Sequence, residues 1–237
     1  MTPMPGSLVA TRPARAATGV LALALASGCM TAKLEESRSL DTKIGADESV
    51  VLLAKPHVEG TSAEDEFMDC VGDKIARRSG IHVAPNNAFQ DSMFPWFEPS
   101  TSPQRPEGIA QLLARPAVRQ RIEASGVRYI VWVDGLTRQT DSGGSISCAI
   151  GPAGGGCIGF GWWEKESDYS AVVWDLQESK SAGSVSANVT GTSALVGAIV
   201  PLPFIARVQG AACDRLAEQL GGFLHGTDAS VAATAGT

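Results

Sequence analysis

Hydrophobic and polar residues follow two different periods along the chain, and the change of period predicts strands and helices in turn. Short apolar runs at residues 50–54, 81–84 and 127–134 predict buried strands. The last run is nearly continuous, which is typical of a central strand covered on both faces. Apolar positions with helical spacing lie between these runs and near the C-terminus. They predict helices at residues 61–79, 106–114, 116–125 and 204–224.

Two later segments, residues 169–176 and 183–192, alternate between apolar and polar residues and predict a hairpin. The element order is then β-α-β-α-β, followed by hairpins and a C-terminal helix. This order predicts an α/β or α+β fold, a mixed sheet of about five or six strands with helices packed on it. We assign a single domain to residues 48–226. Residues 227–237 are small and polar and predict a disordered tail.

Residues 1–28 have the organisation of an export signal. Arg12 and Arg15 precede a short apolar run at residues 20–26. This run is far shorter than the roughly 20 residues that a membrane-spanning helix needs. A basic region followed by a short apolar core and small residues is typical of a secretory signal that is removed from the mature protein.

The signal ends at residues 25–29, Leu-Ala-Ser-Gly-Cys, which resembles the lipobox of bacterial lipoproteins. In that family the cysteine thiol is joined to diacylglycerol, the signal is cut before the cysteine, and the new amino group is acylated, with palmitate as a typical chain. The resemblance implies lipidation of Cys29, and several acyl chains give stable anchoring. Met30, in place of the aspartate that retains such proteins in the inner membrane, implies the periplasmic face of the outer membrane. Residues 29–47 are polar and predict a lipidated tether.

The element order together with the lipobox is similar to that of periplasmic envelope-assembly lipoproteins, such as the curli secretion lipoprotein family. The resemblance covers most of the mature chain but rests on pattern rather than on a specific motif. It implies an assembly or binding role in the envelope, and it carries over no functional residue beyond Cys29.

The charge balance restricts the possible partners. The chain has 19 Lys+Arg and 25 Asp+Glu, for a net charge of -6. Nucleic-acid binding needs clustered basic residues that release counterions, so this composition argues against nucleic acid as a partner. It argues equally against electrostatic adhesion to anionic lipid. Attachment to a membrane is therefore expected to come from the N-terminal lipid.

Four cysteines remain after Cys29, namely Cys70, Cys148, Cys157 and Cys213. An even number of cysteines in an oxidising compartment predicts disulfides. Cys148 and Cys157 flank a glycine-rich segment, whereas Cys70 and Cys213 lie on predicted helices. We therefore predict the pairs Cys148–Cys157 and Cys70–Cys213, with four buried free thiols as the alternative. No Cys-x-x-Cys pair is present, so we expect no zinc site and no other metal or cofactor.

Candidate catalytic residues are sparse. The three histidines, His57, His82 and His225, have no metal-ligand spacing. Residues 141–144, Asp-Ser-Gly-Gly, resemble the segment around the nucleophile of trypsin-like proteases, but the helical periodicity of the first half contradicts that fold, and a hairpin turn is the simpler interpretation. The glycine-rich segment 154–161 does not match a phosphate-binding loop. Enzymatic activity is thus left open, with a non-enzymatic role favoured.

Two aromatic clusters are the best candidates for partner contacts. Trp96 and Phe97 lie in a proline-rich loop, and Trp162 and Trp163 follow the glycine-rich segment. Tryptophan and phenylalanine often anchor interfaces, although ordinary core packing is the alternative at each position. The favoured hypothesis is an envelope lipoprotein that binds a protein or a glycan. The alternative is a periplasmic hydrolase, which a cleft joining a histidine, a carboxylate and a serine would favour.

Overall fold

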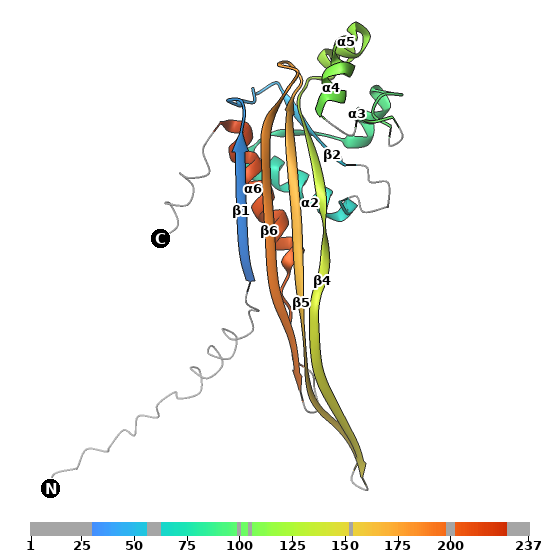
Figure 1. Cartoon of the computed structure of the whole chain (residues 1–237), viewed down its shortest axis with the longest axis vertical. Coiled ribbons are helices and arrows are strands. Elements are labelled where there is room, and N and C mark those ends of the chain that lie inside the picture. The colour runs from blue at the N-terminus through green and yellow to red at the C-terminus, as the bar shows by residue number, and fades with distance from the viewer. Residues whose placement is uncertain are drawn as a thin grey trace, which may run out of the picture.

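The computed structural model describes residues 30–55, 63–98, 101–103, 106–151, 154–197 and 202–226. Within these ranges the chain forms one mixed sheet with helices on both faces (Figure 1). The strands are β1 (Met30–Arg38), β2 (Ser49–Ala54), β3 (His82–Ala84), β4 (Val127–Gly151), β5 (Gly154–Asp175), β6 (Lys180–Gly197) and β7 (Leu202–Phe204). The helices are α2 (Asp65–Ser79), α3 (Asn86–Ser92), α4 (Pro106–Leu113), α5 (Pro116–Ser125) and α6 (Val208–His225).

The strand order is β1-β6-β5-β4-β2-β3, with β7 paired to β6. Strand β2 runs parallel to β3 and β4, and the other pairs are antiparallel. This arrangement confirms the predicted mixed sheet with packed helices and a C-terminal helix. The described part of the sheet has seven strands, slightly more than the sequence predicted.

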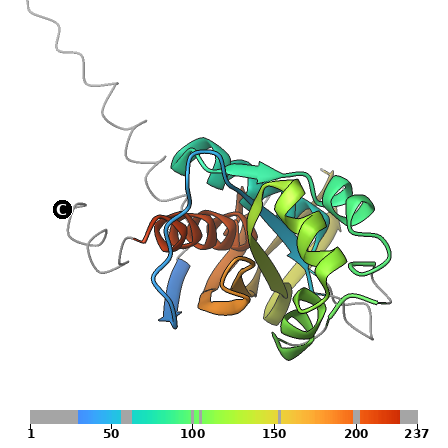
Figure 2. The same cartoon turned by 90° about the horizontal axis from the view of Figure 1, so that it is seen from above.

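Two hydrophobic cores lie on opposite faces of the sheet because successive side chains of a strand point to opposite faces. Val50 and Leu52 of β2 pack with α2 and α6, and the intervening Val51 and Leu53 pack with α3, α4 and α5. Strand β4 divides its apolar residues in the same way over its first seven positions, residues 127–133. Seen from above, the two groups of helices lie on either side of the sheet (Figure 2). The nearly continuous apolar run at residues 127–134 thus marks a strand that is covered on both faces, as predicted.

The predicted ends of two helices, at residues 79 and 125, are confirmed. Gly80 and Gly126 follow α2 and α5 with φ of 67° and 69°, the left-handed conformation that closes many helices. Thr61, the predicted start of the first helix, lies outside the described residues, and α2 begins at Asp65. The proline-rich loop also contains a short helix, α3, that the sequence did not predict.

The predicted tether over residues 29–47 is wrong in its described part. Met30–Arg38 forms the edge strand β1, paired in continuous register with β6. The following segment is also held, since the buried Thr42 donates a hydrogen bond to the Phe223 carbonyl and Ile44 N–H bonds the Leu224 carbonyl at 3.0 Å. A polar sequence without apolar periodicity can form an edge strand because the neighbouring strand supplies its backbone hydrogen bonds. Residues 30–47 therefore belong to the folded domain, ahead of the predicted boundary at residue 48.

Strands β4 and β5 are much longer than predicted, with 25 and 22 residues. They continue past the helices as a projecting hairpin (Figure 1). Residues 141–144, predicted as a turn, lie inside β4 opposite residues 161–164 of β5, so that prediction is wrong. Glycine and serine have weak strand propensity, and here the long antiparallel ladder determines the conformation instead.

The predicted export signal, Cys29 and the predicted tail at residues 227–237 lie outside the described residues. Among the helices that are described, none has the length and hydrophobicity required to cross a bilayer.

Candidate functional site

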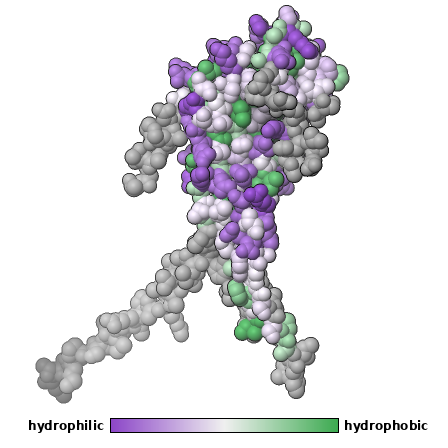
Figure 3. Space-filling view, viewed as in Figure 1, coloured by the Kyte–Doolittle hydropathy of each residue, from purple (hydrophilic) through white to green (hydrophobic). Residues whose placement is uncertain are grey.

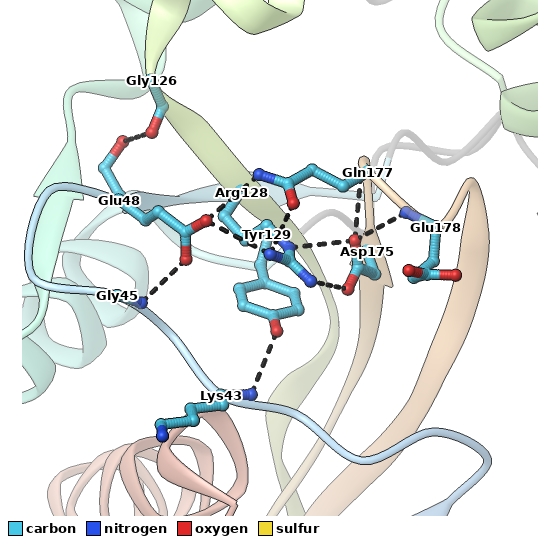
Figure 4. Close-up of polar contacts among 10 residues, drawn as sticks. Lys43, Gly45, Glu48, Gly126, Arg128, Tyr129, Asp175, Gln177 and Glu178 are labelled. Carbon is cyan, nitrogen blue, oxygen red and sulfur yellow. Dashed lines mark hydrogen bonds and ion pairs between the residues drawn. The ribbon is translucent and has the colours of Figure 1, made fainter.

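An ion pair between the half-buried Arg128 and the buried Asp175 lies where β4 begins and β5 ends (Figure 4). Arg128 donates to both carboxylate oxygens of Asp175, from Nε to Oδ1 at 3.1 Å and from Nη2 to Oδ2 at 2.7 Å. Its Nη1 donates to Glu48 at 3.2 Å and to Gln177 at 2.7 Å. The hydrogen bond to Asp175 is the largest influence on Arg128 and raises the pKa of its guanidinium. The charge of Arg128 is therefore fixed at any ordinary pH.

The Asp175 carboxylate also accepts hydrogen bonds from the backbone of the turn that follows it. Its side chain is 3% exposed, and its Oδ1 also accepts the backbone N–H groups of Gln177 and Glu178, each at 2.9 Å. The carboxylate thus holds the turn after β5 while Arg128 neutralises its charge. A pocket of about 340 Å³ adjoins this cluster, and α5 contributes Arg119 and Glu123 to its walls. Since the four acceptors of Arg128 belong to the protein itself, the geometry supports a structural role for the cluster.

A second polar cluster joins α2, α6 and the sheet. Tyr169 is buried on β5, and its ring stacks on Phe67 with a centroid distance of 3.5 Å. Its hydroxyl donates to Glu64, and Gln209 donates to the same carboxylate at 3.0 Å. Burial, followed by the hydrogen bond to Glu64, raises the pKa of Tyr169 to about 12. The cluster ties the N-termini of two helices to one point on the sheet.

The raised pKa of Tyr169 predicts a loss of stability in alkali. In the unfolded chain the phenol ionises near pH 10, whereas in the folded protein it stays neutral until about 12. Its stabilisation is therefore complete below pH 10 and is lost as pH rises towards 12. We expect Tyr169→Phe to reduce the fall in unfolding free energy over this range by roughly 2 kcal/mol. Urea unfolding at several alkaline pH values measures it, and an unchanged slope in the variant would contradict the assignment.

The predicted contact residue Trp96 lies on the wall of a groove of about 450 Å³. The indole is half-buried against the core under α3–α5, and the guanidinium of Arg121 lies 5.0 Å from its ring centroid. Arg121 also donates to the Phe94 carbonyl at 3.0 Å, which fixes the cation over the ring. The rest of the groove is lined by Pro95, Thr101, Pro103, Gly108, Gln111, Leu112 and Arg115.

Phe97 does not belong to this surface, and its prediction as a partner contact is wrong. Its side chain is only 1% exposed and packs edge-on against Phe89, with centroids 5.4 Å apart. The segment turns so that Phe97 enters the core while its neighbour Trp96 stays at the surface. Phe97 is therefore an anchor that holds the groove in place.

Trp162 and Trp163 are half-buried on β5, at the base of the projecting hairpin. As neighbours on a strand they point to opposite faces of the sheet. Trp162 lies over Gly143, where a Cβ would stand 3.0 Å from the indole nitrogen. The hairpin projects away from α3–α5, so the structure does not bring this pair together with Trp96 (Figure 1).

One predicted disulfide is confirmed. Cys70 of α2 and Cys213 of α6 are bridged, with a Cα–Cα distance of 6.3 Å. Cys148 is disulfide-bonded, and Cys157 is the residue opposite it in the β4–β5 register. The specific bridge Cys148–Cys157 stays a prediction.

The histidines are not gathered at a site. His82 is exposed on the short strand β3, and the exposed His225 contacts the Ser79 carbonyl through Nε2 at 2.9 Å. His57 lies outside the described residues. In the part of the chain that the structure describes, no three His, Cys, Asp or Glu residues are grouped so as to hold a metal ion.

Comparison with known proteins yields only distant likenesses, all of them to solved structures. The chain matches no family model and no curated protein sequence. Among solved structures, the PelC dodecamer from Paraburkholderia phytofirmans is similar with 12% identity and a TM-score of 0.40, over 82% of this chain and 98% of that chain. A single-residue variant of the same PelC gives 11% identity and the same TM-score and coverage. A likeness at this level assigns this chain neither a family nor a function.

Proposed function

We propose that this protein is a lipid-anchored component of the bacterial cell envelope, on the periplasmic face of the outer membrane, that binds a protein or glycan partner without catalysis. The anchor is supported by the lipobox at residues 25–29. The binding role rests on one observation, the half-buried Trp96 on the wall of a preformed groove.

The groove suits recognition because its aromatic wall is already ordered. Trp96 is held from below by the core and from above by Arg121, and its backbone N–H bonds the Met93 carbonyl at 2.9 Å. A partner that contacts the part of this ring exposed in the groove would lose little entropy in ordering it, because the side chain is already held in place. Gln111 and Arg115 add an amide and a guanidinium to the same groove. These groups can donate hydrogen bonds to the carbonyls of a peptide or the hydroxyls of a sugar.

The binding role predicts that Trp96→Ala weakens recovery of a partner from solubilised envelope while the domain stays folded. Because Trp96 is half-buried, we expect a stability loss of about 1–2 kcal/mol, below the ~3–5 kcal/mol typical of a core aromatic residue. Phe97→Ala is the matched contrast and should show the full core loss. Urea unfolding and quantitative pull-down separate the two effects. Unchanged partner recovery with folded Trp96→Ala would refute the role of the groove.

The anchor predicts that Cys29→Ser abolishes lipidation. Without the thiol no thioether to diacylglycerol can form, so the variant should be unprocessed or released from the membrane. Metabolic labelling with a fatty-acid analogue, followed by membrane fractionation, measures both effects. Label retained by the Cys29→Ser protein would place the modification elsewhere. Cys70→Ser/Cys213→Ser is the control for loss of cysteine alone and should keep its label.

A further inference from the structure

The outer part of the β4–β5 hairpin contains no charged residue. We call residues 142–151 and 154–163 the distal arm; the sequence from 142 to 163 includes no Asp, Glu, Lys or Arg. The last charged residues before the arm are Asp141 on β4 and Glu164 on β5. They are directly paired across the two strands, so the charged part of both strands ends at the same position along the hairpin. Nearer the domain the hairpin is charged, with Arg138 donating to Glu166 at 2.9 Å. The arm thus has a sharp boundary between a charged base and an uncharged end.

Large apolar side chains are exposed on one face of the distal arm. Ile158 is 68% exposed and Phe160 is 49% exposed, and both lie on β5 two residues apart. Trp162 continues the same face by strand alternation. The residues opposite these three on β4 are Ser147, Ser145 and Gly143, which are too small to cover them. The apolar colour on the lower part of the hairpin is visible in Figure 3.

The sheet places the start of the described chain at the base of the distal arm. Met30 pairs with Gly191 of β6, and Gly191 pairs with Lys165 of β5, one residue from the charge boundary. The N-terminal end of β1 and the arm point in the same direction (Figure 1). Cys29 directly precedes Met30 in the sequence. From the boundary the arm continues for ten paired positions, from Ser142↔Trp163 to Gly151↔Gly154, or about 34 Å at ~3.4 Å per residue.

We propose that the distal arm is a second membrane contact, with Ile158, Phe160 and Trp162 seated in the interfacial layer of the lipid bilayer. The proposal rests on the proposed lipid anchor, which would bring the membrane to the level of Met30. Moving an apolar side chain from water into lipid lowers the free energy, and tryptophan favours the boundary between headgroups and acyl chains. The absence of charge over 22 residues removes the main cost of entry.

The open edge of β4 limits the depth of this contact. Among the described residues, β4 pairs with β2 only as far as Val133, and beyond it the same edge of β4 has no strand partner. Unpaired backbone groups are costly in hydrocarbon but are satisfied by water and headgroups. The arm therefore lies in the interface with its apolar face towards the acyl chains. A second copy or another protein paired with this edge is the competing occupant.

Site-specific photocrosslinking in cells tests the proposal on the full chain. The photoreactive amino acid benzoylphenylalanine replaces Phe160, which is exposed, so the fold should tolerate it. The control carries the same group at Ser170, which is exposed on the same face of β5 but on the charged side of the boundary. We expect a several-fold higher yield of lipid adducts at position 160 than at position 170. Retention of the Cys70–Cys213 bridge verifies folding in both variants.

Two outcomes overturn the inference. Adducts of position 160 with a second copy or another protein, in place of lipid, would show that the arm is a protein interface. Equal lipid yields at the two positions would show that the arm has no membrane preference. Fatty-acid labelling of Cys29 in the same cells reports on the anchor separately. A labelled protein without lipid adducts at position 160 refutes the arm contact alone, whereas lipid adducts in an unlabelled protein refute the anchor alone.

Discussion

Replacing Arg128 by alanine is expected to lower the free energy of unfolding by about 3–5 kcal/mol, the cost typical of removing one partner from a buried ion pair. The substitution leaves the Asp175 carboxylate, which is 3% exposed, without its bidentate counter-charge. The two backbone N–H groups that remain cannot neutralise it. Glu48 and Gln177 also lose a shared donor. Urea unfolding at neutral pH measures the loss.

Arg119→Ala is the matched control for Arg128→Ala. Arg119 lines the same pocket but is exposed, with one hydrogen bond to the Leu113 carbonyl at 3.3 Å. Its removal should cost less than about 1 kcal/mol. Arg128→Lys should recover little of the stability, because an ammonium group cannot form the planar fork with a carboxylate. Equal losses in Arg128→Ala and Arg119→Ala would show that the buried pair contributes nothing specific.

The elements that the sequence predicted well are those with strong hydrophobic patterns. Strand β2 was predicted to within a residue. Its five consecutive apolar residues, Val50 to Ala54, are typical of a strand covered on both faces, and the structure places their side chains in the two cores. The C-terminal helix α6 was predicted from the spacing of residues such as Leu216 and Leu220, which the structure buries completely. In both elements the hydrophobic pattern of the sequence arises because the same side chains are buried in the fold.

The elements that the sequence missed depend on a neighbouring strand. Strand β1 and the distal arm have few buried side chains, so no hydrophobic period marks them. Their conformation comes from backbone hydrogen bonds to β6 and across the β4–β5 ladder. A polar or glycine-rich segment of this kind is indistinguishable from a loop until its pairing partner is known.

The candidate sites were predicted unevenly for a similar reason. The sequence singled out Trp96 and Phe97 together, but only the path of the backbone decides that one is at the surface and the other in the core. The Arg128 cluster was missed, because Glu48, Arg128 and Asp175 are far apart in the sequence. One signal was present, since Arg128 is a charged residue within the apolar run of residues 127–133. Such a residue needs a buried partner.

Loss of the Cys70–Cys213 bridge is expected to destabilise the domain by an amount comparable to the loss in Arg128→Ala. The bridged cysteines are 143 residues apart, and closing so long a loop removes about 5 kcal/mol of chain entropy from the unfolded state. We expect Cys70→Ser/Cys213→Ser to lose about 2–5 kcal/mol, since measured effects often fall below the entropic value. Lys74 and Arg78 of α2 both pair with Asp214 of α6, so the helices keep a contact that preserves the native fold.

Cys148→Ser/Cys157→Ser is the matched control for the bridge between the helices. If the predicted Cys148–Cys157 bridge forms, its loop is so short that the same entropy relation gives roughly half the stabilisation. It would also act within the hairpin, outside both hydrophobic cores. Urea unfolding of the oxidised wild type and of both variants gives the comparison. Reductant should lower the stability of the wild type by more than that of Cys70→Ser/Cys213→Ser, which has only the predicted hairpin bridge left to lose. A wild type as stable in reductant as without it would show that packing of α2 and α6, rather than the bridge, holds the two helices together.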